Sequence, residues 1–172
     1  MQTYGEVSAF RRAVRRSAAT RPMAWLYARI QEPIDRFVFR ITRGRTTLST
    51  WMSGVDLVML VTTGARTGRR RALPVLGLRD GERIVVIASN YGRPRNPAWY
   101  HNLRAHPRAS VIADGVEWEV EARELAGEER ERYFERGAEV YPGFDHYRRW
   151  ASHRRIPVLT LDPVGPAATP LR

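Results

Sequence analysis

Two Asp-Gly pairs, Asp80-Gly81 and Asp114-Gly115, each separate two short runs that are predicted as strands. This dipeptide between such runs is the strongest short-range signal for a two-residue β-hairpin. A hairpin joins antiparallel neighbours, whereas parallel strands need a crossover connection of a dozen or more residues. The chain is therefore predicted to form an antiparallel sheet and not a doubly wound parallel one.

Alternating and apolar runs predict the rest of the sheet. The stretch from Val116 to Arg123 alternates apolar and charged residues, as a strand with one buried and one solvated face does. A short helix is predicted after Asn96, and one or two helices in 127–152. The predicted strands are 57–63, 71–79, 83–89, 109–113, 116–123 and 156–162. The fold class is therefore mainly β with helices (α+β): a small antiparallel barrel with a helix inserted between strands.

Three regions differ in composition. Residues 1–50 are predicted as an N-terminal helical arm and linker, 51–162 as the barrel and 163–172 as a flexible tail. No long apolar core follows the basic start, as a signal peptide requires. The longest apolar run, 57–61, is far below the ~18 residues of a membrane span. We therefore expect a soluble protein, or one that lies on a membrane surface.

The formal net charge is +11, and all 29 basic residues are arginine. Without lysine or cysteine the chain cannot form a Schiff base, use a Walker lysine or bind a metal through thiolates. Guanidinium groups suit phosphates and carboxylates, so an anionic partner is expected, although genome base composition alone would give the same bias. We expect no nucleic acid partner, because the arginines are scattered along the chain. We expect no metal, because the four histidines lack ligand spacing.

The stretch SNYGRPRNPAWYHNLRAHPRASV, residues 89–111, joins two predicted strands. Asn96 is predicted to cap a helix whose first turn contains Pro97, where the missing N–H costs nothing. The free backbone N–H groups of that turn, beside two arginines, would form an anion site. The alternative is a purely structural helix with Trp99 in the core.

A second motif, VTTGARTGRRRALP at 61–74, places Gly64 and Gly68 around Ala-Arg-Thr between two predicted strands. The glycines permit a tight turn, and the threonines with Arg66 and Arg71 offer hydrogen-bond donors to phosphate. It is neither a Walker loop nor a Rossmann fingerprint, because lysine is absent and a strand follows. This motif is the second predicted anion site.

Four blocks, LVTTGARTGRRRALPV, DGERIVVIASN, RNPAWYHNLRAHP and YPGFDHYRRW, resemble in order and spacing the deazaflavin-dependent nitroreductase family. This family belongs to the split β-barrel flavin and deazaflavin oxidoreductases, and the resemblance covers residues 45–162. It implies a split β-barrel of about six antiparallel strands that binds coenzyme F420, an 8-hydroxy-5-deazaflavin. The implied activity is an F420H2-dependent reductase that transfers a hydride to a quinone, a nitroaromatic compound or a similar electron-poor acceptor.

The resemblance also implies site residues. Those that would hold the phosphate and polyglutamate tail are Ala65, Arg66, Thr67 and Arg71. Those that would flank the deazaflavin and its ribityl chain are Ala72, Leu73, Pro74, Val75, Leu76, Ile87, Ala88, Ser89 and Asn90. Those that would close the site are Ala98, Trp99, Tyr100, His101 and Asn102. The implied acceptor pocket consists of Tyr141, Phe144 and Tyr147, with the two tyrosines as catalytic residues.

Two positions depart from the family pattern. Asn90 stands where members often have a lysine, so Arg93 or Arg95 would have to replace that charge. Phe144 stands where a tyrosine hydroxyl is expected, which bears on nitroimidazole reduction. The aromatic residues at 141, 144 and 147 also have the spacing of a helix core stripe.

The sequence leaves other functions open. A flavin mononucleotide (FMN) reductase on the same barrel and a non-catalytic F420-binding protein share the predicted cofactor residues. We expect a cytoplasmic protein. A homodimer is left open, as is attachment of the basic, aromatic N-terminal arm to the inner face of the cell membrane.

Overall fold

The computed structural model describes residues 57–165 and 169–170, so the predicted arm at 1–50 lies outside the described residues. The elements follow in the order β1 (Leu57–Thr63), β2 (Arg70–Asp80), β3 (Arg83–Ile87), the 3-10 turn η2 (Asn90–Gly92), α4 (Ala98–Ala105), β4 (Arg108–Ala113), β5 (Val116–Glu124), α5 (Gly127–Val140), α6 (Gly143–Trp150), β6 (Val158–Pro163) and β7 (Thr169–Pro170).

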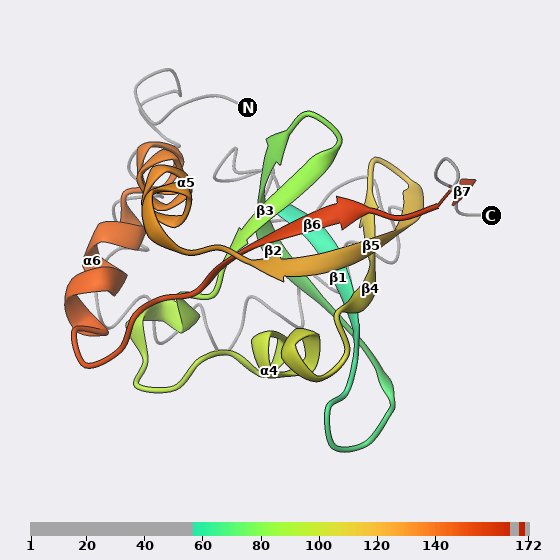
Figure 1. Ribbon diagram of the computed structural model, residues 1–172, viewed down its shortest axis with the longest axis horizontal. Coiled ribbons are helices and arrows are strands. Elements are labelled where there is room, and N and C mark those ends of the chain that lie inside the picture. The colour runs from blue at the N-terminus through green and yellow to red at the C-terminus, as the bar shows by residue number, and fades with distance from the viewer. Residues whose placement is uncertain (1–56, 166–168, 171–172) are drawn as a thin grey trace.

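Six antiparallel strands close into a barrel (Figure 1). The strand order is β4-β1-β2-β3-β6-β5, and β5 pairs back with β4. Closure leaves none of these six strands with a fully unpaired edge. β7, within the predicted tail, adds a two-residue pairing at the start of β5. The predicted antiparallel barrel with an inserted helix is thus confirmed.

Both Asp-Gly pairs lie at hairpin turns. Asp114 and Gly115 have φ values of 54° and 78°, and their flanking residues Ala113 and Val116 are paired. Two successive positive φ values are typical of a type I′ turn, which follows the twist of the strands. At the other hairpin Asp80 is the last residue of β2, and Gly81 starts the turn with a φ of 60°.

The barrel has two separate cores, because β3 is buried on both faces. Ile84 and Val86 belong to the cluster inside the barrel, whereas Val85 and Ile87 belong to the cluster under α5 and α6. This alternation explains why β3 is a continuous apolar run, as strands covered on both faces are. The outer face of β3 therefore supports the two helices.

The segment predicted to hold one or two helices forms two, α5 and α6, which meet at Tyr141-Pro142. Gly137 lets α5 pack closely on the barrel, because a Cβ at this position would meet the Ile87 side chain. Burying this face supplies most of the stability of such an amphipathic helix. None of the helices in 57–165 is long and apolar enough to cross a membrane.

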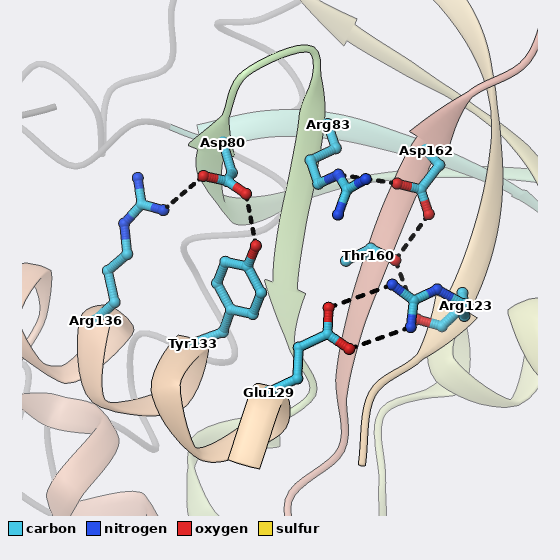
Figure 2. A network of polar contacts seen from close by, with 8 residues as sticks. All are labelled: Asp80, Arg83, Arg123, Glu129, Tyr133, Arg136, Thr160 and Asp162. Carbon is cyan, nitrogen blue, oxygen red and sulfur yellow. Dashed lines mark hydrogen bonds and ion pairs between the residues drawn. The ribbon is translucent and has the colours of Figure 1, made fainter. Parts of the chain in front are cut away.

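Polar contacts also fasten α5 to the barrel (Figure 2). The Tyr133 hydroxyl donates a hydrogen bond to Asp80 over 2.5 Å, and Arg136 pairs with the same carboxylate over 3.2 Å. The hydrogen bond from Tyr133 lowers the pKa of Asp80, and the charge of Arg136 acts in the same direction. One turn earlier in α5, Glu129 pairs with Arg123 of β5.

The inserted helix α4 lies across one end of the barrel (Figure 1). Its cap differs from the prediction: Pro97 is the N-cap residue, and no side chain caps the helix. The Asn96 side chain instead accepts a hydrogen bond from Arg154, 58 residues away. A long-range partner has therefore replaced the local cap that the Asn-Pro pair predicted.

Candidate active site

Asn102 of α4 joins the two predicted anion-binding motifs. Its Oδ1 accepts a hydrogen bond from the backbone N–H of Ala65 over 3.0 Å, and its Nδ2 donates to Oγ1 of Thr62 over 3.0 Å. The turn after β1 is thereby tied to the inserted helix. Two blocks of predicted cofactor residues, 65–71 and 98–102, meet at this link.

The turn between β1 and β2 is closed by its own backbone. The N–H of Gly64 donates to the carbonyl of Arg69 over 2.9 Å, and the N–H of Gly68 donates to the carbonyl of Gly64 over 2.8 Å. Gly68 has a φ of 65°, where a side chain would add strain. The backbone thus holds a defined shape while its arginine side chains point outward.

The arginines of this turn differ in what they contact. Arg70 is used within the protein, since it reaches Glu117 over 3.0 Å and Ser110 over 3.3 Å. Arg66 and Arg71 are exposed, and neither guanidinium has an ion pair or hydrogen bond with another described residue. Unpaired guanidinium groups on a fixed turn are suited to phosphate and carboxylate groups of a ligand.

The β2 block, Ala72 to Leu76, presents two different faces. Leu73 and Val75 pack in the barrel interior, whereas Leu76 packs against the cluster under α5 and α6. Because side chains alternate along a strand, Ala72, Pro74 and Leu76 share the outer face. Only these three residues of the block can contact a ligand on the outside of the barrel.

The third block begins at the end of β3. Ile87, Ala88 and Ser89 are buried, and the chain then turns sharply through Asn90 and Tyr91. These two residues have φ values of 48° and 55°, in the left-handed region. Such a conformation is unusual for a residue as bulky as tyrosine and marks backbone that the surroundings hold in place.

The five α4 residues divide between core and surface. Trp99 and Tyr100 are buried in the barrel core, and the Tyr100 hydroxyl donates to Glu124 over 2.9 Å. Burial raises the pKa of Tyr100, and the neighbouring Glu124 raises it further. Ala98 and His101 are exposed, and Asn102 is half-buried. The structure thus places Trp99 in the core, as the structural alternative expected.

The predicted acceptor residues form an aromatic cluster. The hydroxyl groups of Tyr141 and Tyr147 lie 2.9 Å apart, and Phe144 contacts both rings edge-on. Tyr91 packs edge-on against Tyr147 with the ring centroids 5.9 Å apart. Tyr147 is 2% exposed, whereas Tyr141 is only partly buried. Only Tyr141 of the two catalytic candidates therefore has an accessible part of its side chain.

Burial sets the protonation state of Tyr147. Burial raises the pKa of Tyr147 far above its ordinary value, and Tyr141 raises it further. The Tyr147 hydroxyl therefore stays neutral and hydrogen-bonded. Among residues 57–165 no group of side chains could hold a metal ion.

The role of one arginine at this site could not be predicted from the sequence. Arg154, between α6 and β6, donates hydrogen bonds to the connection between β3 and α4. It stands in the run SHRRIPV beside another arginine, and nothing in the sequence distinguishes the two. Only the three-dimensional structure shows that this guanidinium reaches the predicted cofactor block.

Known proteins resemble this chain over most of its length. A family model described as F420H2-dependent quinone reductase matches residues 34–163. The Mycobacterium tuberculosis protein Rv3178, assigned by its name to the F420H2-dependent quinone reductases, is 30% identical over 109 residues, which cover 63% of this chain and 91% of that protein. Rv1261c, an F420H2-dependent quinone reductase of the same organism, is 43% identical over 54 residues, which cover 31% of this chain and 36% of that protein.

Solved structures agree with these relatives. An F420H2-dependent reductase, FDR-A, is 34% identical with a TM-score of 0.57, and the match covers 62% of this chain and 93% of that chain. A second structure, described as a domain-swapped dimer, is 32% identical with a TM-score of 0.59, over 82% of this chain and 99% of that chain. The resemblance noted in the sequence is thus confirmed, as is the split-barrel fold. The chain belongs to the F420H2-dependent quinone reductase family and is an oxidoreductase whose cofactor is coenzyme F420.

Proposed function

We propose that the chain holds the anionic tail of F420 at the β1–β2 turn and the deazaflavin beside the outer face of β2 and the end of β3, and that it reduces a quinone. The observation that carries this proposal is the Asn102 link, which fixes the arginine-rich turn against α4. The coenzyme, when bound in its reduced form, supplies a hydride to the acceptor. The protein's part is to bind and orient the two reactants, to exclude water and to supply a proton.

The residues present fit a ligand with a long anionic tail. Arg66 in the turn and Arg71 at the start of β2 are exposed, and neither has an acidic partner among the described residues. Arg70 beside them is already paired. A guanidinium hydrogen bond to a phosphate or carboxylate is charge-assisted and about twice as strong as a neutral one. Two such groups therefore suit a tail that carries more than one negative charge.

The ring system would lie against apolar side chains. Pro74 and Leu76 share the outer face of β2, and Leu76 borders the cluster under α5 and α6 to which the buried Ile87 of β3 belongs. Apolar surroundings exclude water from a reactive hydride donor. The backbone beyond Ser89 is held in its left-handed turn, so this wall has a fixed position.

Tyr141 is proposed as the residue that gives a proton to the acceptor. Reduction of a quinone to a hydroquinone takes one hydride and one proton. The Tyr141 hydroxyl is oriented by Tyr147 at 2.9 Å, and a tyrosine hydroxyl can serve as a general acid toward an acceptor oxygen. Tyr147, being buried, acts through Tyr141.

Cofactor titrations test this function. F420 should bind more tightly than FMN, because the F420 tail reaches both arginines. Arg71→Ala should weaken F420 binding by about 1.5–3 kcal/mol, the usual value for a hydrogen bond to a charged group, or about 10- to 150-fold in dissociation constant. Arg132→Ala, which removes an exposed charge from α5, is the matched control and should leave F420 affinity unchanged.

Other outcomes of the same titrations identify other functions. Equal affinity for FMN and F420, or an Arg71→Ala variant that binds normally, would contradict the assignment of the tail site. Tight binding of F420 without reduction of any quinone would indicate a non-catalytic carrier. Parallel assays with a quinone and a nitroimidazole determine the acceptor class, for which Phe144 in place of a tyrosine favours the quinone.

We further propose a homodimer and a membrane-associated arm. The similar structure described as a domain-swapped dimer supports the dimer, which light scattering of the purified chain would detect as twice the monomer mass. The basic and aromatic composition of residues 6–42 supports the arm's attachment to anionic lipid. Sedimentation with anionic vesicles should be salt-sensitive and lost on deleting residues 1–42. A full-length chain that stays in the supernatant at low salt would overturn the membrane proposal.

A further inference from the structure

The connection between β3 and α4 carries both ends of the proposed cofactor site. Ser89 and Asn90 begin it, and α4 starts at Ala98 just after it. Its first turn has three successive positive φ values, at Asn90, Tyr91 and Gly92. Left-handed backbone at non-glycine residues costs about 1–2 kcal/mol each, so this shape persists only if other contacts hold it.

Arg154 supplies those contacts from another part of the fold. It lies between α6 and β6, in a segment that runs beside the connection (Figure 1). Its Nη2 donates to the carbonyl of Ser89 over 2.7 Å, its Nε to the carbonyl of Arg93 over 3.0 Å and its Nη1 to Oδ1 of Asn96 over 2.5 Å. One guanidinium thus joins the beginning, middle and end of the connection.

The neighbouring side chain adds a second contact on the same side. The Nε2 of His153 lies 3.1 Å from the carbonyl of Pro94. A carbonyl oxygen only accepts, so this nitrogen carries the proton of the imidazole. The connection is therefore fastened at four points, at residues 89, 93, 94 and 96.

Arg154 has no carboxylate partner among the described residues, unlike Arg79, Arg123 and Arg136. Its hydrogen bonds go to three backbone carbonyls, that of Ala88 over 3.5 Å included, and to one side-chain amide, all of which are neutral acceptors. Arg155, next in the chain, is exposed and instead lies 3.5 Å from Glu131. The planar fork of an arginine can serve three separated acceptors at once, which a lysine ammonium cannot do in the same directions.

We propose that Arg154 is a positioning residue for F420, because it sets the separation between the Ser89 wall of the deazaflavin slot and the first turn of α4. This inference rests on the proposed function for the identity of the ligand, but the clamp itself is a property of the chain alone. Arg154 acts through the connection and does not need to touch the coenzyme.

Hydrogen exchange of the cofactor-free protein tests the clamp directly. The amides of Gly92 and Arg93 donate to the carbonyls of Ser89 and Asn90 over 3.0 Å each, so they report on the turn. In Arg154→Ala these two amides should exchange at least about tenfold faster, since local opening controls exchange. Amides of the β1–β2 pairing should keep their rates. Arg155→Ala is the matched control and should leave all these rates unchanged.

F420 titration tests the consequence for the site. Arg154→Ala should raise the dissociation constant at least about tenfold, and Arg154→Lys should restore little of the loss because it lacks the fork. Guanidinium chloride at about 50 mM, far below denaturing concentrations, should recover part of the affinity in Arg154→Ala, whereas sodium chloride at the same concentration should not. A residue with only a general effect on stability would show no such rescue.

Each outcome bears on the proposal. Unchanged exchange at Gly92 and Arg93 in Arg154→Ala would overturn the clamp. Faster exchange with an F420 affinity within about twofold of the unmodified protein would overturn the positioning role. If Arg154→Ala fails to fold by circular dichroism, Arg154→Lys carries the same two measurements. Failure of the unmodified protein to bind F420 would refute the proposed function, while the exchange result would still decide the clamp.

Discussion

Replacing Asn102 by leucine should loosen the β1–β2 turn and weaken the fold by a measurable amount. The substitution keeps the side-chain size and removes both hydrogen bonds, to Ala65 and to Thr62. The Ala65 N–H is exposed and can turn to water, so its loss costs little. Thr62 is 1% exposed, and a buried polar group that loses its partner costs about 1–3 kcal/mol. For a chain of this length this corresponds to a fall in Tm of roughly 2–12 °C.

A double-mutant cycle separates the hydrogen bond from other effects of the leucine. Thr62→Val removes the buried hydroxyl, and in the double variant Thr62→Val with Asn102→Leu neither partner is left unsatisfied. The double variant should therefore cost less than the sum of the single variants, by about 0.5–1.5 kcal/mol. Urea unfolding measures each free energy, and the slope of the transition confirms that the compared states are the same.

The experiment also includes a control variant and a measurement of F420 affinity. His106→Ala changes an exposed residue at the end of α4 and should leave both stability and F420 affinity unchanged. Asn102→Leu should also weaken F420 binding, because the turn that carries Arg66 and Arg71 loses its anchor. Single-variant costs that add within about 0.5 kcal/mol would refute the direct Asn102–Thr62 contact. Normal F420 affinity in Asn102→Leu would refute the role of the link in the site.

Three further changes test other parts of the structure. Tyr141→Phe should slow quinone reduction by about 10²-fold, the lower value for a lost general acid, with F420 affinity nearly unchanged. Tyr147→Phe should slow it less. Both roles would be contradicted if rapid-mixing kinetics showed the same turnover in the two variants as in the unmodified protein. The folded-state pKa of Asp80 is lowered, so its contribution to stability is present above the unfolded pKa and lost as pH falls through the folded value. Asp80→Asn should accordingly flatten the decline in unfolding free energy below about pH 4, and an unchanged acid limb would contradict this. Gly137→Ala should destabilise the fold by about 1–3 kcal/mol, because its Cβ meets Ile87; a neutral or stabilising effect in urea unfolding would show that α5 can shift away from β3.

The sequence predicted the features that depend on a few consecutive residues. The Asp-Gly pairs predicted both hairpins, because positive φ values at such positions are a property of a few consecutive residues. The limits of the alternating strand β5 were placed to within one residue, at 116–123 against the observed Val116–Glu124. The end of β3 was placed two residues too late, at Ser89 and not Ile87. The run IAS is apolar or small throughout and gave no sign that the strand would stop.

The contacts between distant segments could not be predicted in this way. Asn102 and Ala65 are 37 residues apart, and Arg154 and Asn96 are 58 apart. Asn96 shows the limit most clearly: the Asn-Pro pair favours a local cap, yet the side chain binds a guanidinium that only the barrel brings near. Side chains with several possible partners take the one that the tertiary structure offers, and a single sequence does not contain that choice.

Helix geometry divides the family-implied residues of α4 into two groups with different roles. Ala98, His101 and Asn102 are spaced at three and four residues and form the first group. Ala98 and His101 are exposed, whereas Asn102 is half-buried at the border of this face, where it bonds to Thr62 of β1. Trp99, Tyr100 and Leu103 share the opposite face and are buried in the core. The family resemblance predicts cofactor contact for all five residues from 98 to 102. The period of a helix, however, lets only one of its faces contact a ligand. We therefore propose that the first group contacts the coenzyme, and that the second group acts on the site only by seating the helix that carries it.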